Sequence, residues 1–178
     1  ILKTRRFGYD GKGQARFDTV TDLAALWAEF ETPCIAEGLI DFAWEGSVIV
    51  ARNQEGACKA YPLVENQHKD HILDVTLAPA PKADAALMAE AEKQALGLAE
   101  SLELEGLLAV EYFITADKKL IANEVAPRPH NSGHWSQDGA ACDQFEQLVR
   151  AALGFALGST DVVTPVKMYN LLGKAGDT

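Results

Sequence analysis

Two glutamates on neighbouring apolar segments are the residues whose types and spacing first indicate chemistry. Glu111 stands inside the apolar run LLAVEYFI, and Glu124 lies in a second apolar run beyond the turn 116–119. If Thr115 faces Leu120 across this turn, counting back places the two glutamates opposite each other on one face of a hairpin. Like charges in that position destabilise a sheet unless a cation neutralises them. Mg²⁺ prefers hard oxygen ligands and takes one or two carboxylates together with phosphate oxygens, so the pair predicts a magnesium site.

The magnesium prediction depends on the register of this hairpin. A slip of one residue would turn every side chain of one strand to the opposite face. Asn123, beside Glu124, offers another oxygen to a metal ion. For Glu111 two interpretations therefore stay open at this point, a metal ligand and an ordinary carboxylate that faces solvent.

A polar loop with the sequence RPHNSGHW, residues 128–135, follows the second of these segments. Its prolines and glycine disfavour both helix and strand, so its polar side chains are displayed from irregular backbone. The Arg128 guanidinium can bind a carboxylate or phosphate through two parallel hydrogen bonds. His130 can act as an acid, a base or an oxyanion donor near neutral pH. A zinc site is disfavoured, because the chain contains neither an HExxH motif nor a CxxC pair.

A glycine-rich segment, GYDGKGQ at residues 8–14, is the second candidate for binding an anion. Closely spaced glycines let backbone N–H groups turn toward a phosphate, and Lys12 adds a positive charge. Lys3, Arg5 and Arg6 lie just upstream in an otherwise acidic chain. The spacing matches neither a P-loop nor a dinucleotide-binding fingerprint. A phosphate-covering flap and a plain hairpin turn both remain possible.

A third candidate is Glu37, which ends a predicted strand just before Gly38-Leu39-Ile40. A carboxylate at a strand end can accept a hydrogen bond from a ribose hydroxyl, or it can simply be exposed to solvent. Glu45 and His68 leave the same two possibilities open.

The composition excludes several classes of protein. Lys and Arg total 16 and Asp and Glu total 26, so the net charge of −10 disfavours binding to nucleic acid or to acidic lipid. No apolar run approaches the roughly 20 residues of a membrane span, so an integral membrane protein is excluded. Three widely separated cysteines predict reduced thiols and a cytoplasmic location. The chain starts ILKTRR without Met, which predicts a piece of a longer protein.

Short apolar strands and amphipathic helices must position these residues, which predicts an α+β layered architecture of mostly antiparallel strands. The first expected helix has its apolar positions from Leu23 to Phe30 and is capped by Asp22 or Thr21, and the other two are 84–104 and 143–157. The expected strands are 34–38, 47–52, 57–63, 107–115, 120–125 and 165–172, with turns at 53–56 and 116–119, while 66–73 fits no element well. The predicted core-facing residues of the second helix are Leu87, Ala91, Ala95, Leu98 and Leu102. Those of the third are Phe145, Leu148, Val149, Ala152, Leu153 and Ala156.

Two long stretches, KTRRFGYDGKGQ at 3–14 and NEVAPRPHNSGHWSQDGA at 123–140, together with DQFEQLVRA at 143–151, resemble the 5-(carboxyamino)imidazole ribonucleotide synthase family. These enzymes are the ATPase subunits of phosphoribosylaminoimidazole carboxylase, and the resemblance extends from Lys3 to the MYNLLG tail at 168–173. It implies the ATP-grasp fold and a cytoplasmic homodimer. It also implies ATP-dependent carboxylation of 5-aminoimidazole ribonucleotide with bicarbonate in purine biosynthesis. The products would be the carboxyamino ribonucleotide, ADP and phosphate.

The resemblance also implies a role for each matching residue. Lys3 would bind an ATP phosphate, and the flap over the phosphates would consist of Gly8, Tyr9, Asp10, Gly11, Lys12, Gly13 and Gln14. The remaining ATP contacts would come from Glu37, Gly38, Leu39, Ile40, Glu45, His68, Asn123 and Glu124. Mg²⁺, or Mn²⁺ in its place, would be held by Glu111 and Glu124. Arg128 and His130 would receive bicarbonate or carboxyphosphate and, with Asp10, would be catalytic. The aminoimidazole ribonucleotide would contact Tyr9, Asp10, Gln14, Arg128, His130 and Asn131.

The chain departs from the family at some points, and other functions stay open. Phe7 stands where the family has a glycine, and the EGL hinge at 37–39 need not match every member. The family also has an amino-terminal domain and more of each flanking domain. Residues 1–35 are therefore predicted to be a remnant of the first ATP-grasp subdomain, 36–165 the second, and 166–178 the start of a small domain. This chain alone is expected to be weakly active or inactive. The alternatives are a formate-dependent glycinamide ribonucleotide ligase, a non-catalytic binding module and a zinc-binding module.

Overall fold

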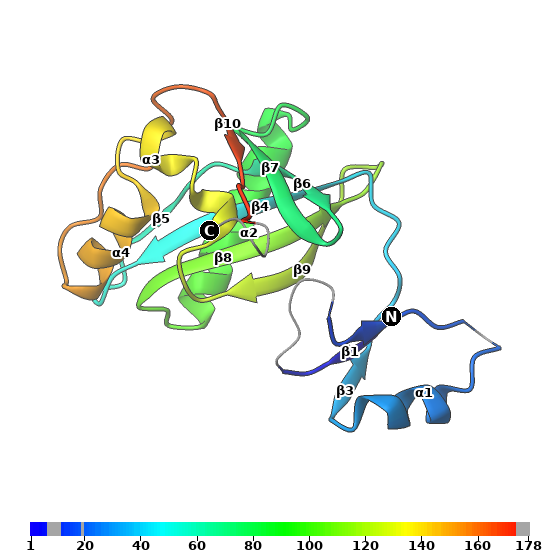
Figure 1. The fold of residues 1–178 in the computed structure, drawn as a ribbon. Helices are drawn as coiled ribbons and strands as arrows, with labels where there is room; N and C mark the ends of the chain where they lie inside the picture. The colour runs from blue at the N-terminus through cyan, green and yellow to red at the C-terminus, as the bar shows by residue number, and fades with distance from the viewer. Residues whose placement is uncertain (7–11, 19, 174–178) are drawn as a thin grey trace. The chain divides into compact units, whose positions relative to one another are not determined.

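The computed structural model of the chain describes residues 1–6, 12–18 and 20–173. The chain forms two compact units (Figure 1). One unit contains residues 1–41 and 68–72, and the other contains residues 42–67 and 73–178.

The smaller unit is built on a three-stranded antiparallel sheet with one helix. The strand order is β2-β1-β3, with bounds β1 Leu2–Thr4, β2 Gln14–Ala15 and β3 Cys34–Ala36. The helix, α1, spans Leu23–Phe30 as predicted. Its N-cap is Asp22, whose carboxylate accepts the N–H groups of Ala24 and Ala25 at 3.0 and 3.1 Å. Such a cap satisfies backbone donors that have no partner within the helix.

The larger unit is built on a seven-stranded sheet of order β10-β7-β6-β4-β8-β9, with β5 pairing β4. The central strand β4 runs antiparallel to β5, β6 and β8. The bounds are β4 Trp44–Arg52, β5 Cys58–Ala60, β6 Val64–Lys69, β7 Ile72–Ala78, β8 Gly106–Ile114, β9 Leu120–Ala126 and β10 Val166–Tyr169. The helices are α2 Ala85–Ser101, α3 Ser136–Gly139 and α4 Gln144–Ala152, with a short 3-10 turn, η1, at Asn131–Gly133.

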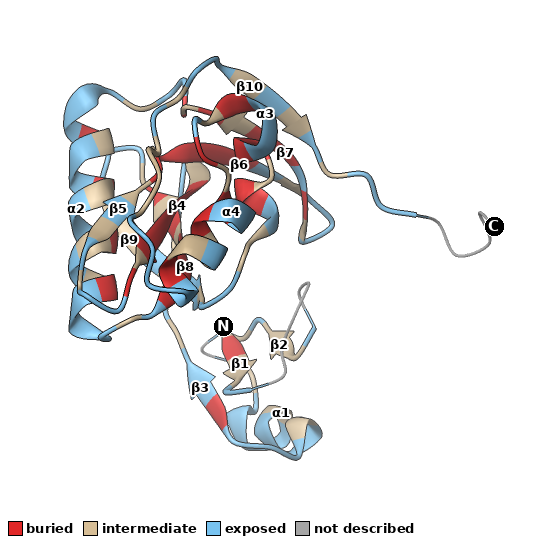
Figure 2. Cartoon of the chain, turned by 90° about the vertical axis from the view of Figure 1, so that its left-hand side faces the viewer, coloured by how far each residue is buried: buried red, intermediate tan, exposed pale blue. Residues whose placement is uncertain are grey.

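Two helical layers cover opposite faces of this sheet (Figure 2). On one face α2 packs against Val48, Val50 and Val110 through the stripe Leu87, Ala91, Ala95 and Ala99. The small alanines allow the helix to approach the strands closely. The other face carries a second cluster, in which Ile49, Ala51, Ala109 and Trp135 are buried and Leu148 of α4 is partly buried.

Several strand boundaries differ from the sequence prediction. The strand predicted at 57–63 is only three residues long, because Pro62 has no N–H to donate to a ladder. The segment 66–73 forms the end of β6 and the start of β7. The turn between them places Asp70 and His71 at φ 51° and 66°. Two consecutive positive φ angles are typical of tight hairpins, which usually carry Asn or Gly there, so Asp70-His71 is not a clear turn signal in the sequence.

The predictions for the helix faces were partly wrong. Leu102 is 56% exposed, because α2 ends at Ser101 and Leu102 is only its cap. In α4 the buried residues are Gln144, Gln147 and Ala151, and the helix ends at Ala152 rather than at 157. The residues predicted to face the core but found exposed are Phe145, Val149, Ala152, Leu153 and Ala156, and only Leu148 is partly buried. The Gln144 and Gln147 side chains face inward because their amides form hydrogen bonds with the backbone of the loop residues His130 and Gly158. Within the described residues, no helix has both the length and the apolar character needed to cross a bilayer.

Candidate active site

The two glutamates lie opposite each other, as the sequence predicted. Glu111 of β8 pairs with Glu124 of β9, and Ser47 of β4 pairs with Glu111 on its other side. Opposed residues share one face of a sheet, so the three side chains form a row across three strands. Ile49 and Ala109 are two residues away from Ser47 and Glu111, so this row lies on the face covered by Trp135 and α4.

The pairing of β8 with β9 reaches this opposition by a different route from the predicted one. At the turn, Ile114 rather than Thr115 pairs with Leu120, so the count from the turn starts one residue off. The ladder then shifts between Tyr112, which pairs with Ala122, and Glu111, which pairs with Glu124. Asn123 is therefore the extra residue of a β-bulge, and this bulge restores the predicted opposition of the two glutamates. Bulges redirect side chains next to active sites, and this one supplies the second carboxylate.

His130 contacts the first of these carboxylates directly. Its Nε2 lies 3.0 Å from Oε1 of Glu111, and both side chains are largely buried, with exposed fractions of 12% and 15%. Its Nδ1 lies 2.8 Å from the hydroxyl of Ser132. That hydroxyl accepts a hydrogen bond from Ser47 at 2.7 Å. The loop histidine is thus held between the β8 carboxylate and a buried pair of serines.

The backbone of His130 is held by a residue that the sequence reasoning missed. Gln144 is fully buried, and its Oε1 accepts the His130 N–H at 3.0 Å while its Nε2 donates to the His130 carbonyl at 2.9 Å. Its Nε2 also lies 2.9 Å from Nδ1 of His134. Burial and the nearby His130 lower the pKa of His134. Its neutral ring can therefore accept the amide hydrogen.

The loop can approach this amide closely because residue 133 is a glycine. A Cβ at Gly133 would overlap the Cδ1 methyl of Ile49 and would lie 2.6 Å from Oε1 of Gln144. The absence of a side chain is therefore a steric requirement at this position. The only signal in the sequence is the glycine in this polar loop. It does not point to Gln144, because Gln is normally a surface residue.

Arg128 and Asn131 complete the predicted loop residues, and both are exposed. The Arg128 guanidinium donates to the carbonyl of Pro129 at 2.9 Å. Asn131 opens η1, and its carbonyl accepts the His134 N–H at 3.1 Å.

The predicted nucleotide-binding residues of the smaller unit lie on and beside its sheet. Lys3 of β1 forms an ion pair of 2.7 Å with Glu37, which follows β3. Gln14 of β2 pairs with Lys3, and Gly13 has a φ of 73°, which glycine adopts without strain. Lys12 and the hinge residues Gly38 and Leu39 are exposed, and Ile40 is half-buried. The flap residues Gly8, Tyr9, Asp10 and Gly11, together with Phe7, lie outside the described residues.

Two further predicted nucleotide contacts lie on strands of the large sheet. Glu45 of β4 is half-buried and pairs with Asn66 on one side and Phe113 on the other. His68 of β6 is half-buried. Their roles toward a nucleotide stay predictions.

The donor set fits a hard divalent cation that shares its ligands with a phosphate. Among the described residues, no group of three or more His, Cys, Asp or Glu side chains could enclose a metal ion. Two opposed carboxylates remain, which is the number that Mg²⁺ usually takes from a protein when phosphate oxygens and water complete the shell. Glu111 and Glu124 therefore fit Mg²⁺ better than a metal that needs a complete protein cage.

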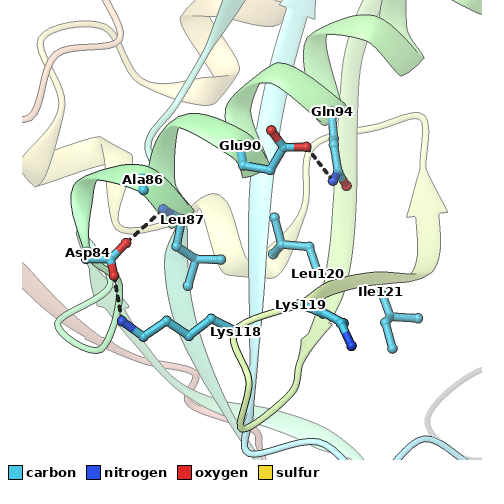
Figure 3. Close-up of a pocket in the computed structure, with 9 residues that line it drawn as sticks. All are labelled: Asp84, Ala86, Leu87, Glu90, Gln94, Lys118, Lys119, Leu120 and Ile121. Atoms are coloured by element: carbon cyan, nitrogen blue, oxygen red, sulfur yellow. Dashed lines mark hydrogen bonds and ion pairs between the residues drawn. The ribbon is translucent and has the colours of Figure 1, made fainter.

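A separate hollow lies between α2 and the β8–β9 turn (Figure 3). Its polar side chains already have protein partners: Lys118 contacts Asp84 at 2.6 Å, Gln94 donates to Glu90 at 2.9 Å, and Lys119 contacts Asp117 at 2.7 Å. Because α2 packs on the face opposite His130, this hollow is distinct from the row of glutamates.

Comparison with known proteins identifies the family. The sequence model of the ATP-grasp domain matches residues 1–145. The chain belongs to the ATP-grasp family. The predicted α+β fold, with mostly antiparallel strands and packed helices, is thereby confirmed.

Individual relatives of this ATP-grasp chain carry the same enzyme name. The chain is 45% identical over 175 residues to N5-carboxyaminoimidazole ribonucleotide synthase of Bacillus subtilis, covering 97% of this chain and 46% of the relative. A solved ADP complex of N5-carboxyaminoimidazole ribonucleotide synthetase matches with a TM-score of 0.89 at 43% identity, over 96% of this chain and 45% of the other. The Aspergillus clavatus enzyme in complex with ADP and 5-aminoimidazole ribonucleotide matches with a TM-score of 0.82 at 28% identity, over 98% and 46%. The chain thus spans about half the length of the curated relatives it matches.

Proposed function

We propose that this chain carries the nucleotide- and metal-binding part of an ATP-dependent carbon–nitrogen ligase. The ligase adds bicarbonate to 5-aminoimidazole ribonucleotide and forms 5-carboxyaminoimidazole ribonucleotide, ADP and phosphate. The observation that carries the proposal is the row of two opposed carboxylates with His130 at 3.0 Å from one of them. The names of the relatives and the bound ADP and ribonucleotide in their solved structures support the choice of substrates.

In this proposal Glu111 and Glu124 hold Mg²⁺, or Mn²⁺ in its place. The bound ion would neutralise charge on the phosphate oxygens of ATP. Glu111 serves two partners, since its carboxylate also lies 3.0 Å from Nε2 of His130, and this contact fixes the ring beside the metal ligands. Such outer hydrogen bonds orient a ligating carboxylate.

The other roles follow from charge and position. Lys3 and the backbone of residues 8–14 would bind the ATP phosphates, and residues 37–40 with Glu45, His68 and Asn123 would contact the nucleoside. Arg128, which is exposed at the start of the polar loop, would bind bicarbonate or carboxyphosphate through its two parallel N–H donors. His130, held in the same loop, would help to receive the same anion. The aminoimidazole ribonucleotide would contact Tyr9, Asp10, Gln14 and Asn131.

Catalysis of this kind consists mostly of positioning and charge neutralisation around the transferring phosphoryl group. The buried anchoring of His130 supports that interpretation, because a rigid donor needs no reorganisation during the reaction. We also propose a homodimer in the cytoplasm. The thiols of Cys34, Cys58 and Cys142 form no disulfide, which supports a reducing compartment.

The decisive experiment measures ADP release by the complete polypeptide in which these residues occur. It uses MgATP and bicarbonate, with and without 5-aminoimidazole ribonucleotide. ADP release that rises only with the ribonucleotide is the expected result. The Glu124→Gln variant should lose this activity and the Mg²⁺-dependent stabilisation by ATP. Glu100→Gln, an exposed change on α2, is the matched control and should keep both. ADP release that ignores the ribonucleotide would refute the proposed substrate.

A further inference from the structure

A continuous chain of hydrogen bonds runs from the interior of the large sheet to His130. The Thr76 hydroxyl donates to Oδ1 of Asn66 at 3.1 Å, and Nδ2 of Asn66 donates to the Ser47 hydroxyl at 2.9 Å. Ser47 then donates to Ser132 at 2.7 Å, and Ser132 reaches Nδ1 of His130 at 2.8 Å. We call Thr76, Asn66, Ser47 and Ser132 the hydroxyl–amide chain. All four side chains are buried, with exposed fractions of 4% or less.

Each hydrogen bond of the hydroxyl–amide chain runs from a donor to an acceptor, and the donor in one bond decides which group donates in the next. The Asn66 amide nitrogen can only donate, so the Ser47 hydroxyl receives a hydrogen there and has its own hydrogen free for Ser132. Ser132 in turn has its hydrogen free for the ring nitrogen. The chain therefore delivers a donor to Nδ1 of His130, and a ring nitrogen that accepts carries no hydrogen.

The other side of the imidazole requires the same arrangement. Nε2 faces the Glu111 carboxylate at 3.0 Å, and an ionised carboxylate only accepts. The backbone N–H of Ser132 also points at Nδ1, at the longer distance of 3.4 Å. Both contacts demand a hydrogen on Nε2 and a lone pair on Nδ1. The contacts around the ring thus agree with the direction of the hydroxyl–amide chain.

We propose that Ser47, Asn66 and Thr76 are positioning residues, which through Ser132 hold His130 as the Nε2–H tautomer. This inference rests on the proposed function, since it assigns these residues to the ring that faces the metal-binding carboxylate. The consequence for chemistry is that His130 presents its only N–H to the Glu111 carboxylate and so helps to fix the position of this proposed metal ligand. The opposite tautomer would direct a lone pair at this carboxylate, so reversal of the chain should disturb the contact.

Reversal of the direction of the hydroxyl–amide chain tests the proposal more sharply than removal of the chain. In Asn66→Asp the introduced carboxylate can only accept, so Ser47 donates to it, Ser132 donates to Ser47, and Nδ1 of His130 must donate to Ser132. Asn66→Leu is the matched control, because it disturbs the same buried position without supplying an acceptor. Spectra are recorded on the complete polypeptide with ¹⁵N-labelled histidine, well above pH 6.5, where the introduced carboxyl group is shown to be ionised by its ¹³C shift. His130→Asn assigns the signals.

The expected result has three parts. The unchanged protein and Asn66→Leu show the hydrogen of His130 on Nε2, whereas Asn66→Asp shows a hydrogen on Nδ1. In Asn66→Asp, kcat for ribonucleotide-dependent ADP release falls about 10²-fold, the size of one acid–base or donor contribution, while KM for ATP changes little. A structural defect alone would affect Asn66→Leu equally and would leave the tautomer unchanged.

Other outcomes test the positioning role separately from the proposed substrate. An unchanged protein that carries the hydrogen on Nδ1 overturns the proposal even if Asn66→Asp does not fold. So does a folded Asn66→Asp protein in which Nε2 alone keeps the hydrogen. If the hydrogen moves to Nδ1 in Asn66→Asp while even the unchanged protein shows no ribonucleotide-dependent ADP release, the positioning role stands and the proposed substrate falls.

Discussion

Two glutamines on α4 allow the anchoring of His130 to be tested against a matched control on the same helix. Gln144 and Gln147 are both fully buried, and each holds the backbone of one loop residue from both sides. Gln144 holds His130, at 3.0 Å to its N–H and 2.9 Å to its carbonyl. Gln147 holds Gly158, at 2.8 Å and 3.1 Å to the same two groups. The two contacts are chemically equivalent, but only the first involves the candidate site.

The change is Gln144→Met and, separately, Gln147→Met, because methionine keeps the length of the side chain and removes its polar atoms. Gln144 loses three hydrogen bonds, counting the one to His134, and Gln147 loses two to backbone and a weak one from the Cys142 thiol at 3.5 Å. At about 1 kcal/mol of net stability per hydrogen bond, we expect losses of about 3 and about 2 kcal/mol. With a urea dependence of about 2 kcal/mol per molar, the unfolding midpoints fall by about 1.5 M and about 1 M.

The two variants should differ in activity. Release of the His130 backbone misplaces its ring relative to Glu111, so Gln144→Met should lower ribonucleotide-dependent ADP release by about 10²-fold at a temperature where the protein stays folded. Gln147→Met should retain most of the activity. Equal losses of activity in the two folded variants, or full activity in Gln144→Met, would refute the argument that the Gln144 amide positions the histidine.

Three further changes have expected outcomes. Gly133→Ala should lower the free energy of unfolding by about 2 kcal/mol, because the added methyl overlaps a buried side chain, whereas Gly97→Ala, with open space around it in α2, should raise it by up to about 1 kcal/mol; urea unfolding of both measures this. Burial lowers the pKa of His134, so below about pH 6.5 the unfolded chain binds more protons, and stability should fall as the pH decreases through that range; His134→Asn should flatten the dependence seen in urea unfolding at pH 7.5 and 5.5. Lys82→Met should cost about 2 kcal/mol in thermal or urea unfolding, because Lys82 contacts the buried Glu65 carboxylate at 2.8 Å; an unchanged midpoint would contradict this.

The sequence predicted the elements that follow hydrophobic period and capping, and it missed a feature that has no such signal. The helix at 23–30 and the opposition of Glu111 and Glu124 were both predicted. The second of these rested on an incorrect pairing at the turn, which the bulge at Asn123 then compensates. Nothing in the residue types of β9 marks an extra residue there, since a bulge is a property of the pairing of two strands. The correct opposition of the glutamates therefore depended on an offset that the sequence could not show.

The buried polar residues were missed for a related reason. Pattern reasoning assigns apolar residues to the core, so it placed Phe145 and Val149 of α4 inside and left Gln144 and Gln147 outside. The observed arrangement is the reverse, because irregular loops need hydrogen-bond partners for their backbone groups and buried amides supply them. Ser47 and Asn66 were missed in the same way, since a polar side chain on an inner face looks like a surface residue in the sequence.

The bulge at Asn123 also bears on how this protein behaves at high concentration. β9 is the last strand in the order of its sheet, and its Val125 is 46% exposed. A long regular edge strand with exposed apolar residues can recruit the edge of another molecule and start aggregation. A bulge breaks the even spacing of ladder groups that such recruitment needs. The residue that brings the second carboxylate into line thus also protects the sheet from edge-to-edge growth.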